Sequence, residues 1–403
     1  MVKINPNRIL GYAAVLMCYY LMFCYFHNTV SKQLRSTVIV QFILSILCIL
    51  VILIYYRKNT VNRTMATGIL ISFAIAMICL DDSRSNIPLI NLWGKAFVWI
   101  LVFIAMRMFA SERIKKVIMA FTVIACLLLI SMFIMSLRDY GKWVSNRDYT
   151  MTNVYYILCF MPFAVEIENK WVKRILVFLI FLCVFLSFKR SAIVVSGVIA
   201  LVMILMLFKE GRKKNFALLL AFVFIAAMII LPILLERMHS QELLTMWFKR
   251  FNDSNTRSSI AADVWRMQWN SSFAQWLFGH GYNAVARDIG YGLSAHNDFL
   301  EILYDYGLLT FILFVALILR LIQYCCRLMR YGVPHAGGMI ISVVLLVVTS
   351  VPSHMFTYST YFIIIALYWG YCTALSEEII ANINTVGGPT GHEDRNPYIS
   401  QSV

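Results

Sequence analysis

The segment "SAHNDFLEILYDYGLLT" places polar side chains directly before a long apolar stretch. Its ionisable and amide residues are His296, Asn297, Asp298, Glu301 and Asp305. A histidine beside a helix N-terminus is favoured in its neutral form, because the helix dipole disfavours a positive charge there. A neutral imidazole is the form that a general base for a sugar hydroxyl requires. The alternative is structural: His296 caps the helix, as Asn297 and Asp298 can also do.

Glu301 and Asp305 lie four residues apart, so they share one face of the expected helix. Ionisable side chains at membrane depth indicate a functional site when they face a cavity. Contact with a neighbouring polar loop would satisfy these carboxylates equally well. The residues leave both interpretations open, and we expect at least one of the two side chains to be structural.

Two adjacent basic residues, Lys189 and Arg190, occupy the short turn "SFKRSA" between two apolar segments. The charge pattern described below places this turn outside, where basic residues in short loops are unusual. A functional interpretation is that Arg190 contacts an anionic group at the outer membrane surface. The alternative is that it caps a helix end or contacts a lipid headgroup.

Two further arginines, Arg257 and Arg266, lie nine residues apart in "NTRSSIAADVWRMQW". On a continuous helix this spacing is two and a half turns, so the two side chains point to opposite faces. One arginine could then bind a ligand while the other is solvated or stacks on Trp269. The planar guanidinium suits a pyrophosphate because it forms bidentate, charge-assisted hydrogen bonds and does not titrate.

The composition requires that membrane helices position these residues. Hydrophobic residues make up 61% of the 403 and charged residues 14%, with a mean hydropathy of +0.76. In ordinary soluble domains, hydrophobic residues make up roughly half of the chain and charged residues roughly a quarter. The net charge of +15 indicates basic loops facing anionic lipid and the cytoplasm, or an anionic lipid-linked substrate, and no nucleic-acid partner is expected. The 10 cysteines lie in apolar segments or at their edges, as small hydrophobic residues.

The sequence predicts an all-α integral membrane protein with about twelve transmembrane helices and one long outward loop. The predicted apolar segments are 9–26, 37–55, 65–80, 87–109, 117–136, 151–165, 171–187, 191–208, 215–235, 297–322, 337–350 and 358–375. Basic loops such as "YYRKNTVNR" and "FKEGRKK" place both termini in the cytoplasm. The predicted organisation is nine helices in 1–235, an outward loop in 236–296, three helices in 297–375 and a disordered tail in 376–403.

Several site types have no sequence signature here. The outward histidines show no close pairing typical of a metal site, and no glycine-rich phosphate loop is present. We therefore expect neither a metal nor a cofactor. A flippase or transporter of lipid-linked oligosaccharides is the competing class, but such proteins tend to place charges within their spans. The centres of these spans are almost free of ionisable residues, which favours an enzyme that acts at the surface.

The chain resembles the O-antigen ligase and polymerase superfamily of bacterial envelope enzymes, both in its architecture and in its motifs. The ligase signature is His, then Asn, Ser or Gln, nine residues, Gly, two residues, then Gly, Thr or Tyr. Here His296 and Asn297 are followed at that spacing by Gly307 and Thr310. "WLFGHGYN" and "FKRSA" also resemble family segments. Where the family commonly has a Gly-Arg pair, four residues before an aromatic, this sequence has Ala261, so Arg257 is the preferred substitute and Arg266 the other candidate.

The resemblance implies a glycosyltransferase architecture of the GT-C-like kind and metal-independent, inverting glycosyl transfer at the periplasmic face of the bacterial inner membrane. The donor would be a glycan on undecaprenyl pyrophosphate. His296 would take the proton from the acceptor hydroxyl. Arg190 with Arg257 or Arg266 would hold the pyrophosphate as its charge develops. Lys189, Asn297 and Asp298 would bind or orient the substrate or His296.

The resemblance favours an O-antigen polymerase, which joins repeat units to one another, because "SAHNDFLEILYDYGL" is similar to polymerase members. The alternative is an O-antigen ligase, which transfers the finished polysaccharide to lipid A core. The expected partners are the undecaprenyl-pyrophosphate-linked glycan, the membrane lipids and, for a polymerase, a protein that regulates chain length.

Overall fold

The computed structural model is entirely helical over the residues that it describes. These residues are 6–31, 35–56, 62–80, 94, 96–143, 153–187, 189–209, 255–289, 294–357 and 359–386. The predicted segment 215–235, the first part of the predicted outward loop and the end of the tail lie outside them. Every other predicted apolar segment contains a helix.

Within the described ranges, five helices are long and apolar enough to cross a membrane, which confirms that the chain is a multi-pass membrane protein. They are α1 (Pro6–Ser31), α2 (Arg35–Tyr55), α6 (Glu112–Trp143), α16 (Asp298–Arg330) and α18 (Ser359–Val386). Shorter apolar helices accompany them: α3 (Arg63–Leu80), α5 (Val98–Phe109), α7 (Val154–Leu158), α8 (Met161–Ala164), α9 (Lys170–Leu186), α10 (Arg190–Lys209) and α17 (Ala336–Ser350).

Local sequence accounts for several helix ends. The Asn169 side chain accepts hydrogen bonds from the amides of Trp171 and Val172, which caps the start of α9. Pro162 stands in the first turn of α8, where the amide that proline lacks would have no helical partner. The predicted segment 151–165 therefore consists of two short helices, α7 and α8.

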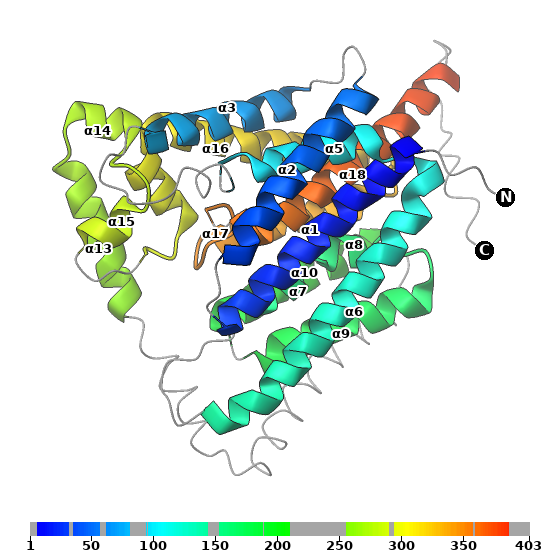
Figure 1. Ribbon diagram of the computed structural model, residues 1–403, viewed down its shortest axis with the longest axis horizontal. Coiled ribbons are helices and arrows are strands. Elements are labelled where there is room, and N and C mark those ends of the chain that lie inside the picture. Colours follow the sequence, from blue (N-terminus) through cyan, green and yellow to red (C-terminus); the bar gives the residue numbers. More distant parts are fainter. Residues whose placement is uncertain are drawn as a thin grey trace.

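Helix α18 is the centre of the bundle. The apolar part of α18 is 78% buried, compared with 39% for the apolar part of α2. It packs along α5, and a Cβ atom at Gly370 would lie only 2.4 Å from the carbonyl oxygen of Phe103. Such close approach through a small residue is typical of membrane helix pairs. In Figure 1, α1, α2 and α6 run beside this centre in similar directions, and α3 lies along α16.

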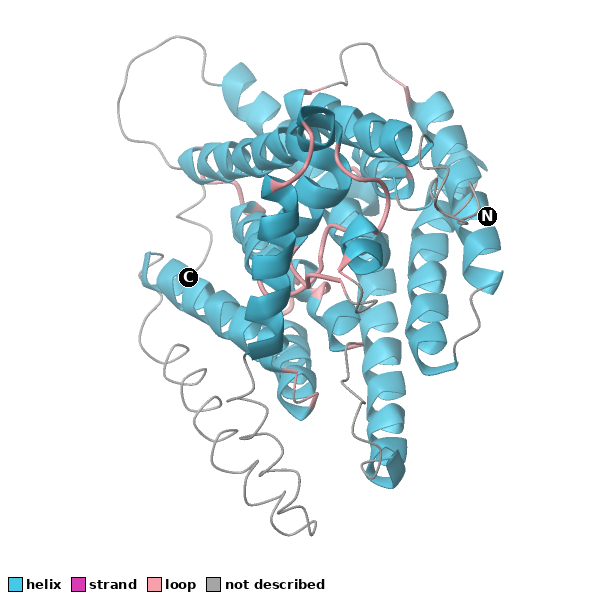
Figure 2. Cartoon of the chain, turned by 90° about the vertical axis from the view of Figure 1, so that its left-hand side faces the viewer, coloured by secondary structure: helices cyan, strands magenta, loops and turns pink. Residues whose placement is uncertain are grey.

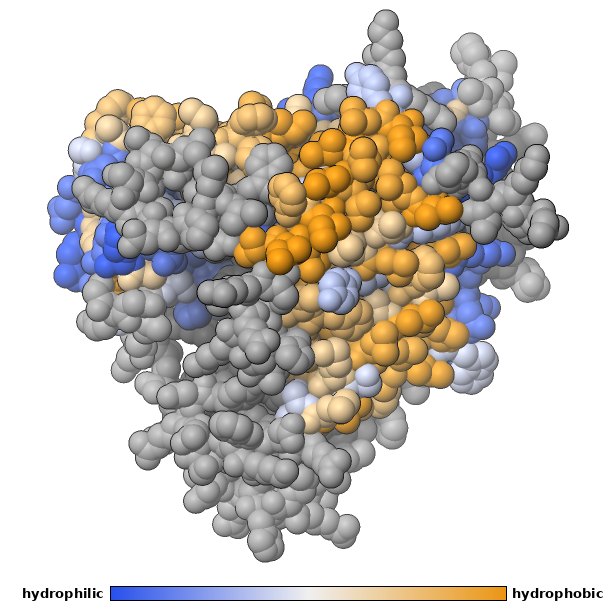
Figure 3. All heavy atoms as spheres, in the orientation of Figure 1, coloured by the Kyte–Doolittle hydropathy of each residue, from blue (hydrophilic) through white to orange (hydrophobic). Residues whose placement is uncertain are grey.

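The surface is divided in the way that a membrane requires. Figure 3 shows apolar residues over the middle of the molecule, and hydrophilic residues at the end formed by α13 and α15 and near the start of α1. Exposed side chains of α2 and α3 include Ile39, Leu53, Phe73 and Met77. Apolar side chains exposed in such numbers fit contact with lipid rather than water.

The last helix corrects the predicted boundary of the tail. Residues 376–386 were expected to be disordered, but α18 continues through them to Val386. Ile380 remains buried, and Glu377 forms an ion pair with Arg107 of α5 at 2.7 Å. These contacts on α5 extend the helix beyond the apolar segment. The later part of the tail lies outside the described residues.

Three short helices form a small cap at one end of the bundle. They are α13 (Asn255–Trp269), α14 (Phe273–Phe278) and α15 (Ala284–Asp288). Ser272 and Gln275 form a reciprocal capping box that starts α14. Residues of α13, α15 and the start of α16 share a separate hydrophobic core around Val264, Val285 and Tyr304. Figure 2 views the molecule from this end, and the start of α16 connects the cap to the bundle.

Candidate active site

Helix α16 is broken near its beginning. Gly307 has φ 76° and ψ 174°, which separates a first segment, Asp298–Tyr306, from the long apolar segment that follows. The backbone carbonyls of Tyr304 and Asp305 accept hydrogen bonds from the amides of His280 and Gly281, each at 3.0 Å. A turn of the cap therefore satisfies polar groups that lie at the break in the helix.

Two glycines make this contact possible. A Cβ atom at Gly279 would lie 2.2 Å from the carbonyl oxygen of Asp305, and one at Gly307 would lie 2.4 Å from that of Leu277. Both glycines also have positive φ, which other residues adopt only with strain. The "GHG" turn and the glycine of the histidine motif are consequently one structural unit.

Asp305 and the residues around it fix the cap on α16. The buried carboxylate of Asp305 accepts a hydrogen bond from the amide of Val285 at 2.9 Å, in the first turn of α15. The His280 ring stacks on Tyr304 with 4.0 Å between ring centroids. The Tyr304 hydroxyl donates to Asp288 at 3.1 Å. Asp305 is thus structural, as expected for at least one of the two carboxylates.

Asp298 is fully buried and holds the connection between α17 and α18. Its carboxylate accepts hydrogen bonds from the Ser350 hydroxyl at 2.6 Å and from the amides of Met355 and Phe356 at 2.7 and 2.8 Å. The amide and hydroxyl of Thr357 donate to its other oxygen at 3.1 and 2.6 Å. This set of donors folds the connection against the start of α16.

The folded connection brings His354 into the site. Its Nδ1 lies 3.3 Å from Glu301 and 3.7 Å from Asp298, and its Nε2 is 2.8 Å from the Ser294 hydroxyl. Burial opposes a positive charge on His354, but the interaction with Asp298 and the charges of Glu301 and Asp298 outweigh it and raise its pKa. The site therefore contains a buried histidine that is biased toward the imidazolium form.

His296 lies next to His354 and is half-buried, with 5.1 Å between the ring centroids. Its backbone has φ 51°, the left-handed conformation that is uncommon for a residue other than glycine. Asn297 caps α16, since its side chain accepts a hydrogen bond from the amide of Leu300 at 3.0 Å. The capping interpretation thus applies to Asn297, and His296 is held in a separate, strained position.

The predicted basic turn lies on the same side of the molecule as His354. Lys189 is half-buried, and its positive charge acts on His354 and lowers its pKa, against the larger effect of the carboxylates. Arg190 is the first residue of α10, and its side chain lies outside the described residues. The next residue, Ser191, accepts a hydrogen bond from the Tyr155 hydroxyl at 2.7 Å. The start of α10 is therefore anchored beside α7.

Of the two arginines of α13, the structure describes the side chain of Arg266 only. The Arg266 side chain is 74% exposed and lies 3.4 Å from Asp263. This is the solvated alternative considered for one member of the pair. The side chain of Arg257 lies outside the described residues. Trp269 packs against the rings of Trp265 and Trp276, with centroids 6.2 and 5.6 Å away.

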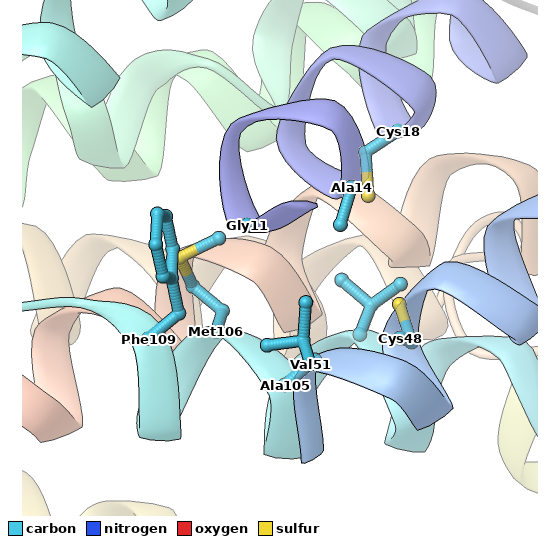
Figure 4. A pocket seen from close by; sticks show the side chains of 9 residues that line it. Gly11, Ala14, Cys18, Cys48, Val51, Ala105, Met106 and Phe109 are labelled. Carbon is cyan, nitrogen blue, oxygen red and sulfur yellow. The ribbon is translucent and has the colours of Figure 1, made fainter. Parts of the chain in front are cut away.

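The described residues contain no group of three or more histidine, cysteine or acidic side chains that could hold a metal ion. A small apolar pocket lies elsewhere, between α1, α2 and α5 (Figure 4). Residues such as Gly11, Cys18, Val51 and Phe109 line it, and they offer no charged group to a substrate. Three buried carboxylic side chains, those of Asp298, Glu301 and Asp305, lie together in the first segment of α16.

Sequence reasoning missed the role of His354 and the contact that Glu301 makes with it. His354 lies 58 residues beyond His296, and no local spacing connects the two. The available signal was a histidine in the short polar stretch "VPSHMFTYS" between two apolar segments. An ionisable residue in an outward connection between two membrane helices can lie at the same membrane surface as the other outward residues, and so can belong to their site.

Comparison with known proteins found one family match. Residues 175–315 match the family model described as O-antigen ligase. The matched region contains most of α9, all of α10 and the cap helices, and the broken start of α16 with His296, Gly307 and Thr310. The comparison with curated proteins found no match. Family members transfer glycans in surface polysaccharide assembly. The segment from 175 to 315 of this membrane protein is thus a domain of the O-antigen ligase family.

Proposed function

We propose that the protein is a glycosyltransferase that polymerises surface polysaccharide repeat units carried on undecaprenyl pyrophosphate. The observation that carries the proposal is the position of His296. Its side chain is half-buried beside His354, and it lies within the residues that match the O-antigen ligase family. A lipid-linked glycan is the substrate class that the family implies. The active site faces the periplasm of the bacterial inner membrane, in keeping with the basic loops at the opposite side.

In the proposed reaction, His296 accepts the proton of the acceptor hydroxyl as the hydroxyl oxygen attacks the anomeric carbon of the donor. The new glycosidic bond forms while the bond from that carbon to the pyrophosphate oxygen breaks. The electron pair of that bond leaves with the lipid pyrophosphate. Attack from the face opposite the leaving group inverts the anomeric centre, and the chain's own groups carry the step without a metal.

Arginines would stabilise the leaving pyrophosphate. Arg190 at the start of α10 is one, because its helix begins near the side of His354. Arg257 is preferred as the other, because Arg266 is exposed and lies beside Asp263. Charge developing on a phosphate is best stabilised by donors that are already in place. Lys189 adds a further positive charge near the same side of the site.

Asn297 and Asp298 would act indirectly. Asn297 caps α16, and Asp298 holds the connection that carries His354. Both residues therefore position the base rather than contact the sugar. The proposed organisation keeps nine membrane helices in 1–235, the periplasmic segment in 236–296 and three helices in 297–375.

Deletion of the gene tests the proposal, with the lipopolysaccharide read on a gel. Loss of a polymerase leaves core that bears a single repeat unit, and the wild-type gene restores the ladder. Unchanged chain lengths in the deletion strain would contradict the proposal.

An O-antigen ligase is the second candidate, because the matching family model carries that description. Loss of a ligase leaves bare core and long chains that remain on the carrier lipid. The same gel therefore separates the two candidates. A pulldown with a chain-length regulator would support the polymerase only.

A further inference from the structure

His354 lies beside both His296 and two buried carboxylates. The His354 ring lies 5.1 Å from the ring of His296, measured between centroids. Its Nδ1 lies 3.3 Å from Glu301 and 3.7 Å from Asp298. Both carboxylate side chains are nine-tenths or more buried. Water therefore screens their charges poorly, and the group that pairs with them matters electrostatically.

Both nitrogens of the His354 ring already contact protein groups. Nδ1 faces Glu301 and the Thr357 hydroxyl, the latter at 3.2 Å, and Nε2 faces the Ser294 hydroxyl at 2.8 Å. The ring is thus fixed from both sides, and it is only 6% exposed. A fixed and covered ring of this kind acts on a neighbouring residue rather than on a sugar.

The charges around the histidine pair come from three elements. Asp298 and Glu301 belong to α16, Lys189 precedes α10, and His354 belongs to the connection between α17 and α18. If His354 carried no charge, it would no longer balance the two carboxylates that it pairs with beside His296. A nearby carboxylate favours the protonated form of a histidine, and a nearby cation favours the neutral form.

We propose that His354 is a positioning residue that packs against the His296 ring and balances the charge of Asp298 and Glu301, so that His296 stays neutral and able to accept a proton. This proposal rests on the proposed function, in which His296 is the general base. It adds a pH-determining residue to that function, drawn from outside the matched residues 175–315. His354 itself takes no proton from the substrate.

The first test is the pH profile of glycan transfer by the full-length protein in lipid vesicles. His354→Gln should move the acidic limb of the profile upward by about one pH unit, with activity largely recovered at alkaline pH. His354→Lys keeps a cation and should leave the limb near its wild-type position. A loss of activity at every pH, without movement of the limb, would mean a purely structural role and would overturn the proposal.

A matched control lies at the other end of α17. His335 is buried and bonded to Glu166 at 2.9 Å, so His335→Gln also removes a buried histidine from a carboxylate. This variant should leave the acidic limb unmoved. A shift as large as that of His354→Gln would show that the limb reports general destabilisation.

A second measurement needs no variant and no activity. Diethyl pyrocarbonate acylates neutral imidazole, and mass spectrometry reports its extent at His296 as the pH is varied. The midpoint should lie below the ordinary histidine value of about 6.5. A midpoint above that value would overturn the proposal even if His354→Gln failed to fold.

The two levels of inference fail differently. Full transfer by His296→Asn would remove the base and with it the proposed function. An inactive His296→Asn, together with an unmoved limb in His354→Gln, would remove only the role of His354.

Discussion

The two ends of α17 carry similar buried pairs, each made of a histidine and acidic residues. At one end His335 bonds to Glu166, and the two side chains are 3% and 4% exposed. The Tyr368 hydroxyl of α18 donates to the same carboxylate. At the other end His354 lies against Asp298 and Glu301. An α-helix of 15 residues separates the ends by about 22 Å.

The pairs differ in what lies beside them. The His335 pair is enclosed by α8, α17 and α18, and a Cβ atom at Gly338 would meet both Tyr368 and Glu166. The His354 pair lies against the half-buried His296. A histidine and a carboxylate therefore pack between helices in both places, and in the proposed function the catalytic difference is the additional residue, His296. The comparison teaches that burial and an ion pair alone do not identify a catalytic site.

The largest expected effect comes from His296→Asn, which tests the residue that distinguishes the His354 pair from the His335 pair. Asparagine adopts positive φ more readily than most residues, so the backbone at 296 should be kept. Removal of the general base should lower the rate of transfer by about 10²- to 10⁴-fold. The rate is measured with a lipid-linked donor in vesicles, and protein level in the membrane serves as the control. Near-normal transfer would contradict the proposed base.

Asp298→Asn should have the next largest effect. The asparagine side chain has an NH2 group where the carboxylate now has an acceptor oxygen. This NH2 group would face backbone amides that themselves donate hydrogen bonds. We expect a loss of about 3 kcal/mol in the free energy of unfolding, because buried donors lose their partner. Thermal unfolding followed by fluorescence-detected size exclusion measures the loss. Transfer should fall as well, because the connection that holds His354 loosens. A stable and active variant would contradict this role.

Glu166→Gln sharpens the comparison from the other end of α17. It weakens the bond to His335 and should cost about 1 to 2 kcal/mol of folding free energy. Transfer per folded molecule should stay close to that of the wild type. The same two assays apply, normalised to the amount of monodisperse protein. A large fall in normalised activity would mean that this pair also contributes to the reaction.

The smallest effect is a pH dependence of stability. The pKa of His354 is raised in the folded protein, so its ion pairing stabilises the fold fully below the unfolded value of about 6.5. This contribution is lost as the pH rises through the higher folded value, by at most about 1.4 kcal/mol per pH unit. The difference in melting temperature between the wild type and His354→Gln should therefore shrink toward alkaline pH. A difference that grew with pH would contradict the assignment.

Hydrophobic patterning predicted most of the helices because membrane spans are dictated by length and apolarity. Asn297 was predictable as a cap for the same local reason. The broken helix was less accessible: the motif included Gly307, but the need for glycine comes from the turn at Gly279, which packs against it. His354 could not be paired with His296 from the sequence, because the pairing depends on how Asp298 folds a distant connection.

The boundary at 376 was wrong for a related reason. Residues 376–386 are polar enough to be interpreted as a tail, but the burial of Ile380 and the contact of Glu377 with Arg107 support their helical conformation. Long-range ion pairs leave no periodic signal. The roles of Arg190 and Arg257 stay predictions, because their side chains lie outside the described residues.

The contact between Gly279 and Gly307 also links the position of the cap to the shape of α16. If α16 straightened at its break, the carbonyls of Tyr304 and Asp305 would return to the helix and release the amides of His280 and Gly281. The cap would then detach from the bundle along with α15, which Asp305 holds at its first turn. A rearrangement of α16 at this break would therefore move the cap and the first segment of α16 together.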